Sequence, residues 1–87
     1  MATQFRRTDE YDGASEILTV VHLESGCLAI QVTTGPEIGD DFAGLYDLDG
    51  EQIGYVGGFE VAEDVPADVA SAIEENWATG NRTVERL

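Results

Sequence analysis

The sequence predicts an α+β domain in which an antiparallel sheet of four to five strands carries one C-terminal helix on a face. Three observations lead to this class. Two hairpin patterns occupy the first two thirds of the chain, one apolar stripe with helical spacing follows them, and 87 residues are enough for a single small domain, 1–87. A small half-open barrel with the helix as a plug is the alternative architecture.

The first hairpin joins two runs rich in apolar and β-branched residues. Ile17–Leu23 is apolar on both faces and therefore predicts a central strand. Glu24-Ser25-Gly26 supplies the turn, because glycine readily adopts a positive φ. Cys27–Thr34 then returns with apolar residues at positions 28, 30 and 32, an alternation that predicts a strand with one buried side.

The second hairpin is built around an Asp-Gly turn. Alternating residues in 42–48 predict the incoming strand, and Asp47–Glu51 contains Asp-Gly, one of the strongest short hairpin signals. Four apolar residues then fall on odd positions, as if on one strand face: Ile53, Tyr55, Phe59 and Val61. Gly57-Gly58 between them predicts a bulge or a sharp bend.

A helix is predicted after the second hairpin. Asp64 is a suitable N-cap, Pro66 fits the first turn, and Gly80 is placed to end the helix. Its apolar stripe consists of Val65, Val69, Ala72, Ile73 and Trp77. The sheet residues that it is expected to cover are Leu28, Ile30, Tyr55 and Phe59. Trp77 is therefore predicted to pack in the core rather than to anchor a partner.

Both ends of the chain leave two interpretations open. Residues 1–13 form either a short edge strand anchored by Phe5 or a flexible, solvated arm. Thr83–Leu87 forms either a last short strand or a tail.

The charge is strongly unbalanced. The chain has 18 acidic residues, four arginines and no lysine, which gives a formal net charge of −14. A folded surface of roughly 5,000 Å² would carry one net negative charge on about every 360 Å². Four arginines cannot form a basic stripe, so direct binding of nucleic-acid phosphates is excluded.

This composition resembles that of small acidic proteins from extremely halophilic archaea. The resemblance rests on the acid content, the absence of lysine and the many small residues. It implies a salt-filled cytoplasm, where the Debye length falls to about 3 Å and repulsion between carboxylates is largely screened. Mimicry of a DNA backbone is the alternative use of the acids. Eight acids lie in residues 1–43 and ten in 44–87, and this even spread favours general solvation.

Targeting and membrane signals point to the cytoplasm. No hydrophobic region follows Arg6 and Arg7, which disfavours both secretory and twin-arginine export. The longest apolar stretch, Ile17–Leu23, is too short to span a bilayer. The single cysteine, Cys27, rules out an intrachain disulfide framework.

Few residues offer chemistry, so no enzyme activity, cofactor or metal site is predicted. His22 is the only imidazole and lies near Cys27 across the expected turn, but no third residue that would orient a Cys–His pair is identifiable. A partly buried strand histidine is the simpler interpretation. Asp47–Glu51 does not have the ligand spacing of a calcium loop, and Gly54–Gly58 matches neither a dinucleotide fingerprint nor a P-loop.

Residues Leu45–Val56 resemble the strand–turn–strand segment of PRC-barrel domains, small β-barrels used as adaptors in RNA processing and photosynthetic assemblies. The resemblance covers about a dozen residues. A C-terminal helix is not part of that small barrel, so no function is carried over from the family.

These observations predict a small non-enzymatic module for protein interaction or regulation, adapted to high salt. Its partner is expected to be another protein or a second copy, bound at a sheet edge or at the helix. The candidate interaction residues are Gly57, Gly58, Phe5 and Tyr11. The alternatives are an acidic nucleic-acid mimic that acts as an inhibitor, and a small-ligand-binding domain around His22.

Overall fold

The computed structural model describes residues 3–23, 25–34, 43–56 and 65–87. Six strands and one helix lie in these ranges. They are β1 (Thr3–Asp9), β2 (Ser15–His22), β3 (Leu28–Thr33), β4 (Ala43–Tyr46), β5 (Gln52–Val56), α1 (Ala67–Asn76) and β6 (Arg82–Arg86).

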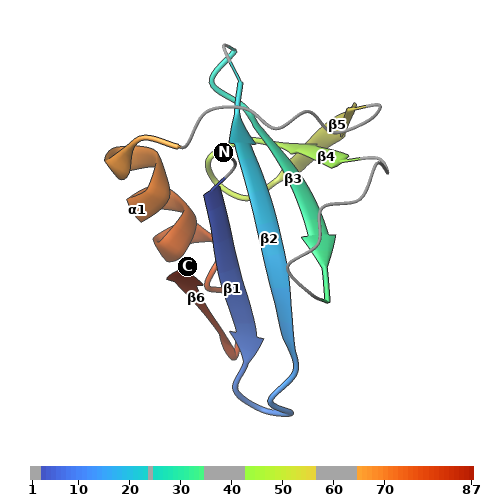
Figure 1. The fold of residues 1–87 in the computed structure, drawn as a ribbon, viewed down its shortest axis with the longest axis vertical. Coiled ribbons are helices and arrows are strands. Elements are labelled where there is room, and N and C mark those ends of the chain that lie inside the picture. Colours follow the sequence, from blue (N-terminus) through green and yellow to red (C-terminus); the bar gives the residue numbers. More distant parts are fainter. Residues whose placement is uncertain (1–2, 24, 35–42, 57–64) are drawn as a thin grey trace.

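The strands form one open antiparallel sheet in the order β5-β4-β3-β2-β1-β6 (Figure 1). Strands β1 to β5 follow one another as neighbours, and β6 returns after the helix to pair with β1. The α+β class is therefore confirmed. The predicted count of four to five strands is too low, because both end segments, for which a strand was only one of two interpretations, belong to the sheet.

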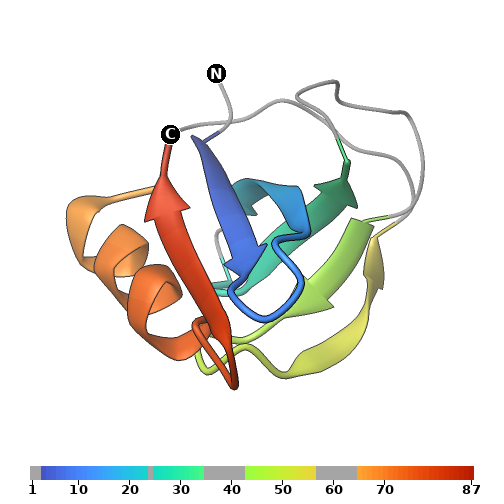
Figure 2. The same ribbon diagram turned by 90° about the horizontal axis from the view of Figure 1, so that it is seen from below.

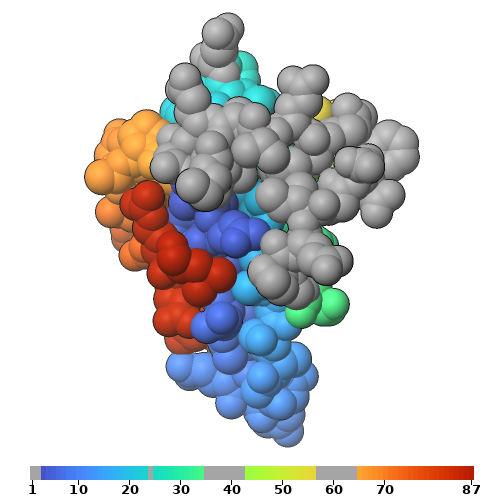
Figure 3. All heavy atoms as spheres, viewed as in Figure 1, coloured from blue at the N-terminus to red at the C-terminus, as the bar shows by residue number. Residues whose placement is uncertain are grey.

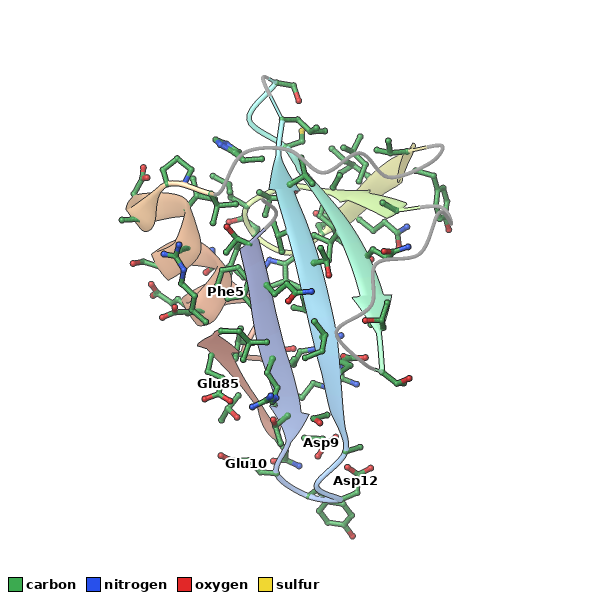
Figure 4. All side chains as sticks on the ribbon, in the orientation of Figure 1. Phe5, Asp9, Glu10, Asp12 and Glu85 are labelled. Atoms are coloured by element: carbon green, nitrogen blue, oxygen red, sulfur yellow. The ribbon has the colours of Figure 1, made fainter. Side chains whose placement is uncertain are left out.

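The N-terminal strand lies inside the sheet rather than at its edge. Phe5 is paired with Leu18 of β2 on one side and with Arg86 of β6 on the other. Its side chain is completely buried, between β1 and α1 in Figure 4. Residues 3–9, for which an edge strand and a solvated arm were both open, thus form an interior strand. The neighbouring Arg6 and Arg7 are accommodated because acids on the flanking strands pair with them.

The first hairpin is buried on both faces. The prediction of a central strand is confirmed for β2, in which positions 17 to 21 are all buried. The prediction of a single buried side is wrong for β3, because Leu28, Ala29, Ile30 and Gln31 are buried in succession. Residues at even positions of β3 face α1, whereas Ala29 packs on the other face in a second, smaller apolar cluster.

The main core lies between α1 and the sheet. The predicted helix stripe is buried, except that Ala70 rather than Ala72 completes it. At about 100° per residue, position 70 falls about 20° from position 77, beside that end of the stripe. The core residues are Phe5, Leu18, Val20, Leu28, Ile30, Val65, Val69, Ala70, Ile73 and Trp77. The expected contacts with Leu28 and Ile30 are therefore present.

The helix is shorter than its sequence signals predict. It begins at Ala67 after Pro66, which occupies the N-cap position in an extended conformation, and it ends at Asn76. The predicted cap Asp64 lies outside the described residues. Gly80 does not end the helix; its φ of 64° instead serves the turn into β6. In the described ranges, no helix has the length and apolar character needed to cross a bilayer.

The turn between β4 and β5 confirms the Asp-Gly prediction. Gly50 has a φ of 89°, which L-residues rarely adopt, and its N–H donates to the carbonyl of Asp47. The Asp47 side chain accepts hydrogen bonds from the backbone N–H groups of Asp49 and Glu51, both at 3.0 Å. This carboxylate therefore caps its own turn, as short polar side chains do.

Candidate interaction surface

The two edges of the sheet differ sharply in charge. Strand β5 has the sequence Gln-Ile-Gly-Tyr-Val and contains no charged residue. Strand β6 has the sequence Arg-Thr-Val-Glu-Arg, so three of its five residues are charged. Charges on an edge strand discourage a further strand from pairing with it, and an uncharged edge lacks this protection.

Strand β5 exposes two large apolar side chains. Ile53 is 52% exposed and Tyr55 is 77% exposed. Tyr55 pairs with Gly44 of β4, which in turn pairs with the core residue Ile30, so Tyr55 projects from the helix-facing side of the sheet. Ile53 is the extra residue at the register irregularity of β5, between Gly54, which pairs with Leu45, and Gln52, which pairs with Tyr46. The expectation that α1 covers Tyr55 is therefore wrong, and Phe59 lies outside the described residues.

Position explains why these side chains are exposed. The helix lies over the part of the sheet nearest β6, and β5 lies on the opposite side of the molecule in both Figure 1 and Figure 2. Figure 3 likewise shows α1 and β6 together along one side. A ten-residue helix is about 15 Å long and about 10 Å wide, so it cannot cover a six-stranded sheet with strands about 4.8 Å apart.

The aromatic pair of Tyr46 and Trp77 forms the border of the core at β4, the strand next to β5. The rings of Tyr46 and Trp77 meet edge to face, with centroids 4.8 Å apart. Tyr46 also lies over Gly44, where an added Cβ would come within 2.5 Å of its Cε1. Gly44 thus makes room for the ring that borders the core, and Tyr55 lies beyond this border.

Arg7 is the polar centre of the helix-facing side. Its guanidinium donates to Glu16 Oε1 from Nε at 2.6 Å and from Nη2, and its Cζ lies 6.0 Å from the centroid of the Trp77 ring. Two hollows, of about 280 and 210 Å³, flank this arginine. Both are smaller than typical small-molecule pockets, which begin at about 300 Å³. The indole Nε1 of Trp77 is buried and has no hydrogen-bond partner among the described residues.

The side chains of His22 and Cys27 do not form a pair, although the hairpin turn brings the two residues near each other. His22 pairs with Leu28, whose side chain belongs to the core under α1. Leu23 donates its N–H to the Cys27 carbonyl at 3.0 Å, and Leu23 packs in the cluster on the opposite face. Because side chains alternate along a strand, His22 and Cys27 project from opposite faces. No group of three metal-ligating side chains is found in the described ranges.

Two acids at the β1–β2 loop accept hydrogen bonds from the backbone of the same loop. Asp9 accepts a hydrogen bond from the Tyr11 N–H, and Asp12 accepts one from the Ala14 N–H, both at 2.8 Å. Figure 4 shows Asp9 and Asp12 at the end of the molecule formed by this loop, with Glu85 further along on the neighbouring strand β6. Other described acids lie in the β4–β5 turn and on the exposed side of α1.

The predicted interaction residues fall in different places. Phe5 lies in the core and offers no side-chain surface, whereas Tyr11 is 87% exposed in the β1–β2 loop. Gly57 and Gly58 lie outside the described residues. Sequence reasoning missed Ile53 and Tyr55, because their alternation was interpreted as an inward face. The absence of charge from 52 to 56 was the available signal.

No protein-family model matches the chain, and no curated protein or solved structure matches it either. The function is therefore inferred from the surface of this chain alone.

Proposed function

We propose that the protein is a small non-enzymatic module for protein interaction or regulation and that it binds its partner at β5. One observation carries this proposal. In a chain with a net charge of −14, the edge strand β5 is uncharged and exposes Ile53 and Tyr55.

The chemistry of this edge suits strand addition. An extended segment that pairs with β5 gains backbone hydrogen bonds along the regular positions 54 to 56, and its side chains contact Tyr55 and the neighbouring Ile53. Aromatic and β-branched side chains stabilise cross-strand pairs by about 0.2–1 kcal/mol each. The other edge, β6, presents Arg82, Glu85 and Arg86, which makes it the protected edge.

A medium of high salt is part of the proposal. At about 0.1 M salt the Debye length is about 10 Å and the acids repel one another, whereas at 1 M it is about 3 Å. The thermal midpoint is therefore expected to fall as KCl is lowered from about 2 M to about 0.1 M. An unchanged midpoint would contradict adaptation to high salt.

The binding site is tested by comparing the two edges. Ile53→Lys places a positive charge on β5, and Thr83→Lys places the same charge on an exposed position of β6. Each tagged variant and the wild type are used for quantitative capture from lysate in about 2 M KCl, where electrostatic adsorption is screened. A specific partner should be lost with Ile53→Lys and retained with Thr83→Lys.

Two results would overturn the proposal. One is a specific partner that both variants retain equally, which would place binding elsewhere. The other is a wild type that enriches neither another protein nor a differently tagged copy of itself above the Ile53→Lys background.

A further inference from the structure

We infer that the smaller of the two hollows beside Arg7 binds a small free amino acid in its zwitterionic form. This hollow, called the Trp77 hollow below, has a volume of about 210 Å³ and lies between the C-terminal end of α1 and the β4–β5 turn. Its lining includes Arg7, Asp49, Gly50 and Trp77. The inference goes beyond the proposed function, because binding here does not depend on the β5 edge.

Arg7 supplies the donors for a carboxylate. Its guanidinium bonds Glu16 Oε1 through Nε and Nη2, so the Nη1 end of the planar group points away from that carboxylate. Glu16 lines the other hollow, whereas the Trp77 ring, 6.0 Å from the Arg7 Cζ, lines the Trp77 hollow. The Arg7 side chain is 15% exposed, and partial burial strengthens its hydrogen bonds to a charged acceptor. Its Nη1 group is therefore suited to bind a ligand carboxylate.

Trp77 adds a second donor. Its side chain is 6% exposed, and Nε1 has no hydrogen-bond partner among the described residues. Buried donors in folded proteins nearly always have a partner. Gly50, which also lines the hollow, lies next to this nitrogen, since a Cβ added there would be 3.5 Å from it. A ligand oxygen on this side of the hollow gives the indole N–H the acceptor that the described residues do not supply.

The Trp77 hollow also favours a positive charge beside these donors. Asp49 lines it with a carboxylate, and the Asn76 carbonyl oxygen lies 3.7 Å from a Cβ added at Gly50. This carbonyl belongs to the C-terminal end of α1, which carries a partial negative charge. The last turn of α1 contains no basic side chain to balance it. An ammonium group bound near Asp49 supplies that positive charge.

Both charges belong to one ligand. A simple anion is repelled by a chain with a net charge of −14, in which Arg7 is already paired with Glu16. A simple cation gains nothing from Arg7 or from the indole N–H. An α-amino acid carries both groups on one carbon and has no net charge. The volume of the hollow equals that of about seven water molecules at about 30 Å³ each, which suits glycine, alanine or serine.

Tryptophan fluorescence tests the site, because Trp77 is the single tryptophan of the chain. The wild type in about 2 M KCl is titrated with glycine, alanine and serine, each up to about 100 mM. At least one of them is expected to give a saturable change in emission with a half-saturation in the millimolar range. An equimolar mixture of acetate and methylammonium offers the same groups unlinked, so its half-saturation is expected to be at least about tenfold higher.

Two substitutions in the β4–β5 turn form a matched pair. Asp49→Asn removes the carboxylate that lines the hollow, and Glu51→Gln removes the same charge two positions away. Both residues hold the turn through their backbone N–H groups, so both variants should fold, which circular dichroism checks. Asp49→Asn is expected to weaken amino-acid binding at least about tenfold, and Glu51→Gln to change it less than about twofold.

Three results would overturn the inference. They are the absence of a saturable change with all three amino acids, a mixture of separate ions that acts as well as the amino acids, and equal binding by the two turn variants. None of these results bears on the proposed function, which is tested by Ile53→Lys and Thr83→Lys. Conversely, Ile53→Lys should bind amino acids like the wild type, whether or not it loses a protein partner.

Discussion

The two edge strands have the same length and are both antiparallel to their neighbours, but β6 exposes charged side chains and β5 exposes uncharged ones. Among the strands that the structure describes, β6 pairs only with β1. It presents charges, and one of them, Glu85, forms a salt bridge of 3.2 Å with Arg6 of that neighbour. Within the described residues, strand β5 pairs only with β4 and presents Ile53 and Tyr55. In a chain so rich in acids, the uncharged edge is the distinctive one, which supports the proposal that a partner binds there.

The helix-facing side of the sheet shows the same contrast. Between α1 and the sheet lie completely buried residues such as Leu18 of β2 and Ile73 of the helix, whereas Tyr55 on the same side of the sheet is 77% exposed. Tyr46 and Trp77 form the border between the two regions. Substitutions under α1 should therefore change stability, and substitutions on β5 should change association.

The largest expected effect comes from emptying the covered region. Ile73→Ala should lower the free energy of unfolding by about 2–5 kcal/mol, because it leaves a cavity at the centre of the core. Tyr55→Ala should change it by no more than about 0.5 kcal/mol. Denaturant unfolding of dilute protein in about 2 M KCl measures both. Similar losses for the two variants would contradict the division into covered and open regions.

A pair of strand glycines gives the next largest difference. Gly44→Ala should destabilise by about 1–3 kcal/mol, because the new Cβ collides with the Tyr46 ring and disturbs its contact with Trp77. Gly54→Ala meets only ordinary contacts and should leave stability unchanged or slightly higher. Thermal unfolding of the two variants compares them. Equal midpoints would show that Tyr46 does not border the core as described.

The smallest expected effect separates two ion pairs of β1. The Arg7–Glu16 side chains are 15% and 31% exposed, whereas those of Arg6–Glu85 are 45% and 63% exposed. Double-mutant cycles should give a coupling of about 1–2 kcal/mol for the first pair and no more than about 0.5 kcal/mol for the second. The first coupling should also persist at high KCl, since burial limits screening. The reverse order would contradict the central role given to Arg7.

Local features of the fold could be predicted from the sequence, and non-local ones could not. The Asp47–Glu51 turn and the stripe through Val69 and Ile73 depend on neighbours a few residues away, and both are present. The pairing of Phe5 with Arg86 joins the two ends of the chain, and no local pattern encodes it. The two end segments are rich in charged residues, so their own sequence could not decide whether they form strands or solvated tails.

The candidate surface was missed for a related reason. Alternation placed Tyr55 on one strand face, but it cannot tell whether a helix covers that face, and it does not reveal the register irregularity at Ile53. The answer depends on where α1 packs, and it packs over the part of the sheet formed by β6 and β1 to β3. The charge content of each edge strand was the sequence signal that could have distinguished them.

Hydrogen exchange of the two edge strands tests the central claim most directly. The wild-type protein is measured in about 2 M KCl alone and with its captured partner, with β5 and β6 amides followed in the same sample. Exchange from residues 52–56 is predicted to slow when the partner binds, while exchange from residues 82–86 stays constant. Protection that appears at β6, or association that leaves β5 unprotected, would contradict the claim that β5 is the binding edge.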